Sequence, residues 1–307
     1  MPKQFSQSES EPIGLLGCGL VGASLAKRMV AAGWSVWAYD PAAGARERIE
    51  ATGVGWLDSE AAVAARCGCL LFSLPGSAEV AVVVQRILPV LPPGSVIVDT
   101  TTGDPEAVEA TARELAAVGV AYLDATLGGS SRQIAAGEGI LLCGGPPEVF
   151  VVLEPLLASL AGTVFHTGET GSGTSMKLVF NLVLGLQRAI LAEGLEFARR
   201  CGIDPQLALA VLKAGPAHAR VMDSKGQKML GEDFSPEARL AQHWKDVGLI
   251  QKQGRANGAS LPFTDVHETL LRTAAAAGWG AFDNSAIIKV FQPPFLHTDS
   301  NPRTSIE

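Results

Sequence analysis

A glycine-rich turn near the N-terminus, Gly17-Cys18-Gly19-Leu20-Val21-Gly22, constrains the fold more than any other feature of the sequence. It closes the apolar run Ile13–Gly17 and opens the segment Val21–Ala32, whose apolar residues have helical spacing. The first glycine permits a tight turn, the second lets the backbone come close to a ligand, and the third lets the helix pack closely on the strand. A strand, this turn and a helix in succession predict the start of a doubly wound α/β domain.

Short apolar runs and helical stretches alternate as far as residue 167. This alternation predicts βαβ units and a mostly parallel sheet. A composition that is 47% hydrophobic but only 6% aromatic suits helices packed on a sheet buried on both faces. The expected strands are Ile13–Gly17, Ser35–Tyr39, Cys69–Leu74, Ser95–Asp99, Val120–Asp124, Ile140–Cys143 and Thr163–His166.

From residue 168 onward the sequence has helical periodicity without alternating strands. We expect one helix from Thr174 to about Arg200, and at about 1.5 Å per residue it would be roughly 40 Å long, enough to link two domains. The next helix is expected to begin at Pro205. The chain therefore divides into a Rossmann domain over residues 1–167 with a loose leader over 1–11, an all-helical domain over 168–291 that begins with the interdomain helix, and a loose tail over 292–307.

The glycine turn has an acidic partner at the end of the second strand, Asp40. Together they predict a dinucleotide site, with the pyrophosphate on Gly17, Gly19, Leu20, Val21 and Gly22 and the ribose hydroxyls on Asp40. A carboxylate repels a 2′-phosphate, and the next three residues include no arginine, so NAD is favoured over NADP. The alternatives are an ordinary glycine-rich turn and an aspartate that only shapes the turn before a proline.

Two further strand ends carry candidate ligand groups. Leu74-Pro75 ends one strand, and the hydroxyl-rich stretch Asp99–Pro105 ends the next. In open parallel sheets the carboxyl ends of strands line the ligand crevice, so these hydroxyls could hold a ribose or a nicotinamide. The alternative is a helix cap, for which Asp104 before Pro105 is well suited.

A lysine and an amide occupy one face of the expected long helix. Lys177 and Asn181 are four residues apart within Gly171–Asn181, and their neighbours are mostly apolar. Polar groups on such a helix are costly unless they have partners or a role. One interpretation is that Lys177 reaches solvent and Asn181 caps a neighbouring loop. Beside a dinucleotide domain, a catalytic pair is favoured.

The motifs, taken in order, resemble those of the β-hydroxyacid dehydrogenases, the family of 3-hydroxyisobutyrate dehydrogenase and tartronate semialdehyde reductase. The resemblance covers residues 12–292 and rests on Gly17–Gly22 with Asp40, Asp99–Pro105, Asp124–Ser130, Gly171–Asn181 and Lys245-Asp246. It implies an NAD(P)-dependent enzyme that interconverts a small β-hydroxy acid, similar to 3-hydroxyisobutyrate, and its semialdehyde or keto form.

The resemblance also implies roles for individual residues. Lys177 would be the general acid/base, with its pKa lowered by burial, and Asn181 would order the substrate. Lys245 would reach the active site near the cofactor. Leu74, Pro75 and Thr102 would contact the nicotinamide half of the cofactor.

One motif departs from the family pattern. The family usually has Asp-Ala-Pro-Val-Ser-Gly-Gly, whose Ser-Gly-Gly holds the substrate carboxylate, but here Thr126 replaces the proline, Gly128 the serine and Ser130 the last glycine. We expect the backbone of Gly128 and Gly129 and the hydroxyl of Ser130 to hold that carboxylate. Alternatively, Ser130 only caps the segment that follows. Arg132 either adds a charge to this loop or lies solvated at the surface.

Charge and composition exclude several other functions. The net charge is −7, from 24 basic and 31 acidic residues, without the basic patch that binding to nucleic acid requires. No uninterrupted apolar run reaches the roughly 18 residues of a membrane span. The five histidines are scattered, so we expect no metal site, and His243 is interpreted as a helix-surface residue. The five cysteines form no recognisable framework, so we expect a cytoplasmic protein, and the apolar helical domain suggests a homodimer or homotetramer.

Two other functions share this architecture. Imine reductases have the same arrangement of domains but generally lack the lysine. Some relatives are non-catalytic dinucleotide-binding scaffolds that have lost it. The presence of Lys177 argues against both.

Overall fold

The computed structural model describes residues 11–293 and separates into two compact units, one that extends to Phe180 and one that begins at Asn181. The division lies within the long helix α8 (Ser172–Arg200), whereas the sequence placed the boundary in front of this helix, at residue 168. The first turns of α8 are counted with the sheet because buried side chains of the sheet hold them, as described below. Residues 1–10 of the expected leader and residues 294–307 of the expected tail lie outside the described part.

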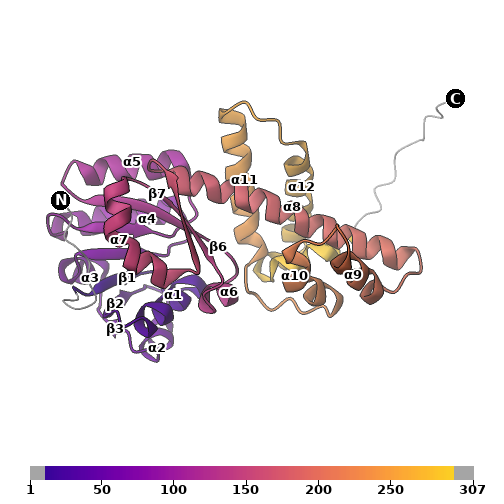
Figure 1. Ribbon diagram of the computed structural model, residues 1–307, viewed down its shortest axis with the longest axis horizontal. Coiled ribbons are helices and arrows are strands. Elements are labelled where there is room, and N and C mark those ends of the chain that lie inside the picture. The colour runs from indigo at the N-terminus through magenta and orange to yellow at the C-terminus, as the bar shows by residue number, and fades with distance from the viewer. Residues whose placement is uncertain (1–10, 294–307) are drawn as a thin grey trace. The chain divides into compact units, whose positions relative to one another are not determined.

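An eight-stranded sheet forms the centre of the first unit, with the strand order β3-β2-β1-β4-β5-β6-β7-β8 (Figure 1). The strands are β1 (Ile13–Leu16), β2 (Val36–Tyr39), β3 (Gly55–Trp56), β4 (Cys69–Phe72), β5 (Val96–Asp99), β6 (Ala121–Gly128), β7 (Ile140–Gly144) and β8 (Thr163–Gly168). All neighbours pair in parallel except β6 and β7, which are antiparallel. The mostly parallel Rossmann sheet is thereby confirmed, and the two-residue strand β3 is an addition to the expected set.

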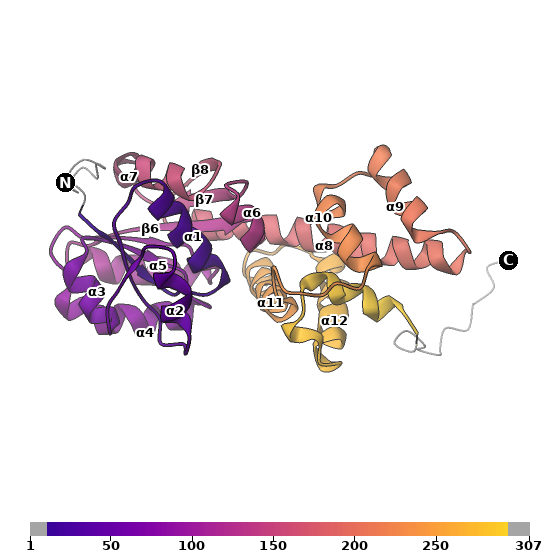
Figure 2. The same ribbon diagram turned by 90° about the horizontal axis from the view of Figure 1, so that it is seen from below.

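Helices cover both faces of this sheet (Figure 2). One apolar core joins Leu15 and Leu71 to Leu25 and Leu153, and the other joins Phe72 to α3, α4 and α5. Since successive strand residues point to opposite faces, both faces are apolar, which is why the strands read as continuous apolar runs. The helices on the first face are α1 (Leu20–Ala31), α2 (Ala45–Glu50), α6 (Ser131–Ala135) and α7 (Pro147–Leu160), and those on the second are α3 (Glu60–Arg66), α4 (Ser77–Ile87) with the short η2 (Leu88–Val90), and α5 (Pro105–Ala116).

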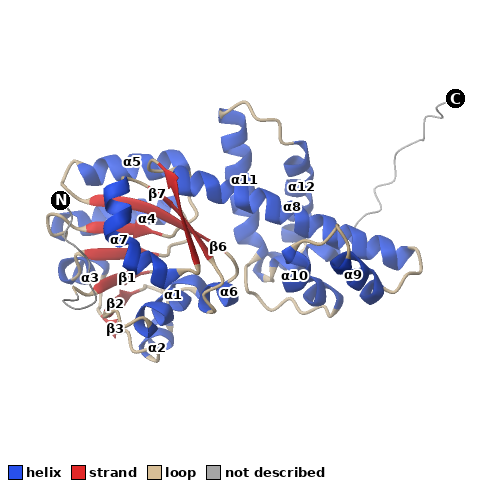
Figure 3. Ribbon diagram, in the orientation of Figure 1, coloured by secondary structure: helices blue, strands red, loops and turns tan. Residues whose placement is uncertain are grey.

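The second unit is built from helices, as expected, and within residues 11–293 all eight strands lie in the first unit (Figure 3). Leu195 of α8, Met229, Val247, Leu271 and Ile287 contribute to one buried apolar core. Besides the rest of α8, the elements are α9 (Pro205–Ala214), α10 (Arg220–Leu230), α11 (Leu240–Ala256), α12 (Pro262–Ala276) and the 3₁₀ helices η3 (Trp279–Ala281) and η4 (Asn284–Phe291).

Helix α8 is long and apolar enough, by length and composition alone, to cross a membrane. Its role in the fold accounts for both properties. Its first turns are bonded to β6, and its later residues Leu191, Ala192 and Leu195 lie in the core of the second unit. The same helix also carries the buried polar residues Lys177 and Arg188.

Candidate active site

The glycine loop has the shape that a dinucleotide pyrophosphate requires. Gly17 has a φ of +98°, and a Cβ atom there would overlap the carbonyl oxygen of Ser73. A Cβ atom on Gly22 would overlap the carbonyl oxygen of Gly17, whereas the space beside Gly19 is open. No side chain caps the N-terminus of α1, and its first turn has no acidic residue. The loop therefore presents backbone amides and the positive end of the helix dipole to an open space, and an NAD(P) pyrophosphate fits it.

Asp40 is bonded to this loop. Its Oδ2 atom accepts a hydrogen bond from the Cys18 amide at 2.6 Å, and its Oδ1 atom accepts one from the Ala42 amide at 2.7 Å. Asp40 thus shapes the turn after β2 and also ties that turn to the glycine loop. The residue is half-buried, so the carboxylate keeps accessible surface and oxygen lone pairs for a ribose.

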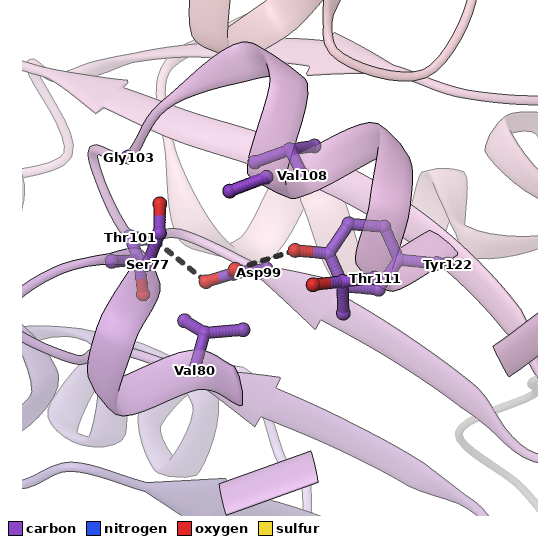
Figure 4. A pocket seen from close by; sticks show the side chains of 9 residues that line it. Ser77, Val80, Asp99, Thr101, Gly103, Val108, Thr111 and Tyr122 are labelled. Carbon is purple, nitrogen blue, oxygen red and sulfur yellow. Dashed lines mark hydrogen bonds between the residues drawn. The ribbon is translucent and has the colours of Figure 1, made fainter. Parts of the chain in front are cut away.

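A buried hydrogen-bond network joins Asp99, at the end of β5, to Tyr122 on β6 and to Thr101 (Figure 4). Asp99 accepts hydrogen bonds from the Tyr122 hydroxyl at 2.6 Å and from the Thr101 amide at 2.8 Å. The Thr101 Oγ1 atom in turn accepts from the Leu74 amide at 3.1 Å. Burial raises the pKa of Asp99 to about 6, although hydrogen bonds from Thr101 and Tyr122 oppose that shift. The network holds the backbone of Leu74 in place.

The hydroxyls at the end of β5 divide between several tasks. Thr100 donates to the carbonyl of Phe72 at 2.6 Å, and Thr101 belongs to the network with Asp99. Asp104 caps α5 by accepting from the Glu106 amide at 3.3 Å, as its position before Pro105 suggested. Thr102, one of the three residues that the resemblance assigned to the nicotinamide half of the cofactor, is half-buried.

Two side chains of β6 hold the beginning of α8. Asp124 accepts from the Gly171 amide at 2.8 Å and from the Thr174 amide at 2.7 Å. Thr126 donates to the carbonyl of Gly173 at 3.0 Å. This bond gives the threonine, which stands where the family usually has proline, a structural role. Burial raises the pKa of Asp124, and its hydrogen bonds to α8 oppose that shift.

The glycines of this motif make the close approach possible. A Cβ atom on Gly173 would lie 2.5 Å from the carbonyl oxygen of Leu142 and 2.8 Å from Asp124 Oδ2. Gly171 has a φ of +89°, which disfavours other residues. These glycines thus bring the start of the helix close to the backbone of β7, and the approach sets the position of Lys177.

Lys177 lies in the second turn of α8 and is only 7% exposed. Its Nζ atom lies 5.0 Å from the centroid of the Phe180 ring. Burial opposes the alternative that this lysine simply extends into solvent. Phe180 in turn lies against the end of β6, where its Cζ atom is 3.1 Å from the Cβ position of Gly128.

Ser130 forms a capping box at the start of α6. Its Oγ atom accepts from the Gln133 amide at 3.3 Å, and its own amide donates to Gln133 Oε1 at 2.9 Å. Of the two roles that the sequence left open, the cap is therefore present, and the hydroxyl proton of Ser130 can still be donated elsewhere. Arg132 is exposed on α6.

In the second unit, Asp246 joins two residues that the sequence had singled out separately. Its Oδ2 atom accepts from Asn181 Nδ2 at 2.9 Å, and its Oδ1 atom lies 3.6 Å from Lys245 Nζ. Asp246 and Asn181 are buried, and the Lys245 side chain is 35% exposed. The carboxylate thus orients both the amide and the ammonium group.

His243, expected on the helix surface, is instead buried beside His267, and the two ring centroids are 5.2 Å apart. The prediction was wrong because Gly185 of α8 leaves room for this pair. A Cβ atom there would overlap His243 Nε2 and lie 2.7 Å from His267 Cε1. Within residues 11–293, no group of three or more His, Cys, Asp or Glu side chains could hold a metal ion.

The burial of His267 predicts that the free energy of unfolding depends on pH. Burial, with a smaller contribution from the charge of Arg188, lowers the pKa of His267 to about 4. Below about pH 6.5 the unfolded chain binds a proton that the folded protein does not, so acidification favours unfolding. We expect this residue to remove up to about 3 kcal/mol from the free energy of unfolding between pH 7 and pH 4.

Urea unfolding of His267→Gln at several pH values tests this expectation. The difference in free energy of unfolding between the wild type and the variant should change by up to about 3 kcal/mol across that range. Parallel pH profiles for the wild type and His267→Gln would contradict the prediction.

The sequence did not reveal what Asp99, Tyr122 and Asp246 do. The bond from Tyr122 to Asp99 and the bond from Asn181 to Asp246 each join two different elements, so no local spacing reports them. The only indication that these residues have a role was that Asp99 and Asp246 lie in the motifs Asp99–Pro105 and Lys245-Asp246, whose residues Thr102 and Lys245 had been assigned roles.

Comparison with known protein families shows the family to which the chain belongs. The family model for the NAD-binding domain of 6-phosphogluconate dehydrogenase matches residues 12–168. The model for the NAD-binding domain of NADP-dependent 3-hydroxyisobutyrate dehydrogenase matches residues 171–291. The chain belongs to the β-hydroxyacid dehydrogenase family. As a β-hydroxyacid dehydrogenase it is an NAD(P)-dependent oxidoreductase that acts on a hydroxy acid, which confirms the class of enzyme expected from the motifs.

Individual β-hydroxyacid dehydrogenases align over nearly the whole chain. A 2-(hydroxymethyl)glutarate dehydrogenase from Eubacterium barkeri is 29% identical and aligns with 92% of this chain and 96% of its own. An L-threonate dehydrogenase from Cupriavidus necator is 28% identical over the same shares. The crystal structure of 3-hydroxyisobutyrate dehydrogenase from Salmonella typhimurium has a TM-score of 0.84 at 26% identity, covering 91% of this chain and 99% of that one.

Proposed function

We propose that this β-hydroxyacid dehydrogenase is NAD-dependent and interconverts a small β-hydroxy acid, similar to 3-hydroxyisobutyrate, and its semialdehyde or keto form. Lys177 is the general acid/base of this reaction. The observation that carries the proposal is the burial of Lys177 at the start of α8, where Asp124 and Thr126 anchor the helix to the end of β6.

Each residue of the site has a part in this reaction. NAD, when bound, accepts the hydride in the oxidising direction and its reduced form supplies it in the other. Lys177 takes the proton of the substrate hydroxyl during oxidation and returns it to the carbonyl oxygen during reduction. Proton transfer by a positioned group of this kind typically contributes about 10²–10⁴-fold to the rate.

The remaining residues bind and orient. The amides of Gly128 and Gly129 and the hydroxyl of Ser130 hold the substrate carboxylate, and Asn181, fixed by Asp246, orders the substrate. The glycine loop and Asp40 hold the pyrophosphate and the ribose, while Leu74, Pro75 and Thr102 contact the nicotinamide half. Lys245, whose Nζ atom lies 3.6 Å from Asp246 Oδ1, binds the cofactor.

The proposal extends to assembly and location. Several large apolar side chains of the helical unit are exposed, and covering them by a second copy would remove apolar surface from water. They include Val183 at 48%, Ile190 at 67%, Phe197 at 69% and Val211 at 62%. We therefore propose a homodimer or homotetramer. We also propose a cytoplasmic location, with which the five free cysteines are compatible.

A cofactor-consumption screen tests the function. NADH oxidation with small semialdehydes, and NAD reduction with the corresponding hydroxy acids, should give turnover. Cyclic imines serve as the competing substrates. Turnover of imines alone would make the protein an imine reductase, and binding of NADH without turnover of any substrate would make it a scaffold.

Ser130 caps α6 and is also proposed to bind the substrate carboxylate, so its replacement should have two separate effects. Ser130→Ala should lower the free energy of unfolding by about 1 kcal/mol because the cap of α6 is lost. It should also raise KM for the acid roughly ten- to a hundredfold, since a hydroxyl bonded to a carboxylate is worth about 1.5–3 kcal/mol.

Steady-state kinetics and thermal melts on the same preparation separate these effects, with Ser131→Ala as the matched control. A lower melting temperature with an unchanged KM would leave Ser130 as a cap only. The amides of Gly128 and Gly129 would then hold the carboxylate without it.

A further inference from the structure

Hydrocarbon fills the space beside Gly128, where the family pattern has a serine side chain. Gly128 ends β6, and its partner across the antiparallel pair is Ile140, the first residue of β7. A Cβ atom on Gly128 would lie 2.6 Å from Ile140 Cγ1, 3.0 Å from Ile140 Cδ1 and 3.1 Å from Phe180 Cζ. The space that a serine side chain would fill is therefore occupied by the apolar side chains of Ile140 and Phe180.

The same phenyl ring reaches the lysine. Phe180 follows Lys177 by three residues on α8, and the Lys177 Nζ atom lies 5.0 Å from the ring centroid. The ring therefore lies close to both the end of β6 and the ammonium group, and all three belong to the first unit. Both Phe180 and Ile140 are half-buried, so each keeps accessible surface.

We propose that Ile140 and Phe180 form an apolar wall beside Lys177 that selects hydroxy acids with a hydrocarbon group, rather than a hydroxyl, on the carbon next to the carboxylate. This inference rests on the proposed function, since it assumes that the carboxylate lies on Gly128 and Gly129 and that the reacting hydroxyl lies at Lys177. A substrate that extends from Gly128 and Gly129 to Lys177 therefore contacts the wall.

The selection follows from the chemistry of the wall. A methyl group placed against Ile140 and Phe180 leaves water for a hydrocarbon surface, which is favourable. A hydroxyl in the same place loses its hydrogen bonds to water and finds no acceptor on either side chain. In the proposed function the nearby hydroxyl of Ser130 accepts from the Gln133 amide and donates its proton to the carboxylate. A difference in binding free energy of this kind, between a methyl group and a hydroxyl group at one position, corresponds to about 10–200-fold in kcat/KM.

Two acids of nearly equal size test the wall. They are 3-hydroxyisobutyrate, which has a methyl group at this carbon, and glycerate, which has a hydroxyl there. The wild-type enzyme with NAD should prefer the first by at least about tenfold in kcat/KM. Phe180→Gln and Ile140→Thr should lower that preference about tenfold, whereas the matched apolar variants Phe180→Leu and Ile140→Val should keep it within about threefold. A merely structural role would lower kcat/KM for both acids equally and leave the preference unchanged, which would overturn the proposal.

Binding separates this inference from the proposed function. In the Lys177→Ala variant saturated with NAD, calorimetric titration should give tighter binding of 3-hydroxyisobutyrate than of glycerate, by a factor similar to the wild-type preference. A preference in binding without wild-type turnover of either acid would overturn the proposed function and retain the wall. Equal dissociation constants in this variant, or a wild-type preference for glycerate, would overturn the wall.

Discussion

Replacing Lys177 with alanine should lower kcat by about 10²–10⁴-fold while NAD still binds. The loss should be this large because the buried amine is the group proposed to move the proton, and water admitted by the smaller side chain is a poor substitute. Steady-state kinetics with the best substrate of the screen measure kcat, and fluorescence titration measures NAD affinity. Lys177→Arg is the informative second variant, since it keeps the positive charge but cannot exchange a proton near neutral pH.

The outcomes for these two variants have distinct meanings. If the lysine acts by proton transfer, Lys177→Arg should be nearly as slow as Lys177→Ala. Full activity in Lys177→Arg would show that the residue acts through charge alone. The matched control is Lys27→Ala, at an exposed position on α1, which should turn over at the wild-type rate. Turnover of Lys177→Ala close to the wild-type rate would remove the residue from the mechanism.

Exchanging the acid of the cofactor site should reverse the choice of cofactor. In the wild type we expect NAD to be preferred, because the Asp40 carboxylate accepts from ribose hydroxyls and repels a 2′-phosphate. The double variant Asp40→Ser with Ala42→Arg removes that charge and adds an opposite one. The ratio of kcat/KM for NAD over NADP should fall by about 10²-fold or more, since charge-assisted hydrogen bonds of about 1.5–3 kcal/mol change on both cofactors.

The double variant should also be less stable than the wild type. Asp40 accepts from the amides of Cys18 and Ala42, so the variant should also melt at a lower temperature. The ratio of the two cofactors is unaffected by that loss because it compares them on the same protein. Ala42→Arg alone, which keeps the carboxylate, is the matched control and should still prefer NAD. A wild-type preference for NADP would contradict the assignment of Asp40.

Much of the first unit could be predicted because its signals are local. The strand before Gly17, the glycine turn and the helix after it follow one another in the chain, and each glycine answers a steric demand of its neighbours. The same holds for Asp104, which caps the helix that begins at Pro105 one residue later. The end of the α/β unit was harder to place, since α8 is a single continuous helix whose first turns bond to β6.

Four features could be recognised from the amino-acid sequence: the Rossmann architecture, the all-helical second unit, the glycine loop with its acid, and the lysine of the long helix. They could be recognised because the periodicity of apolar residues, the turn residues and the spacing of motifs are properties of residues close together in the chain. The surroundings of those groups depend on tertiary packing. The buried position of His243 depends on packing against Gly185, and the bond from Asn181 to Asp246 joins two helices. The wall at Gly128 depends on the register of β6 with β7, which places Ile140 directly opposite. These contacts arise between segments distant in the chain, and their geometry is set by how whole elements pack, so no local pattern encodes them.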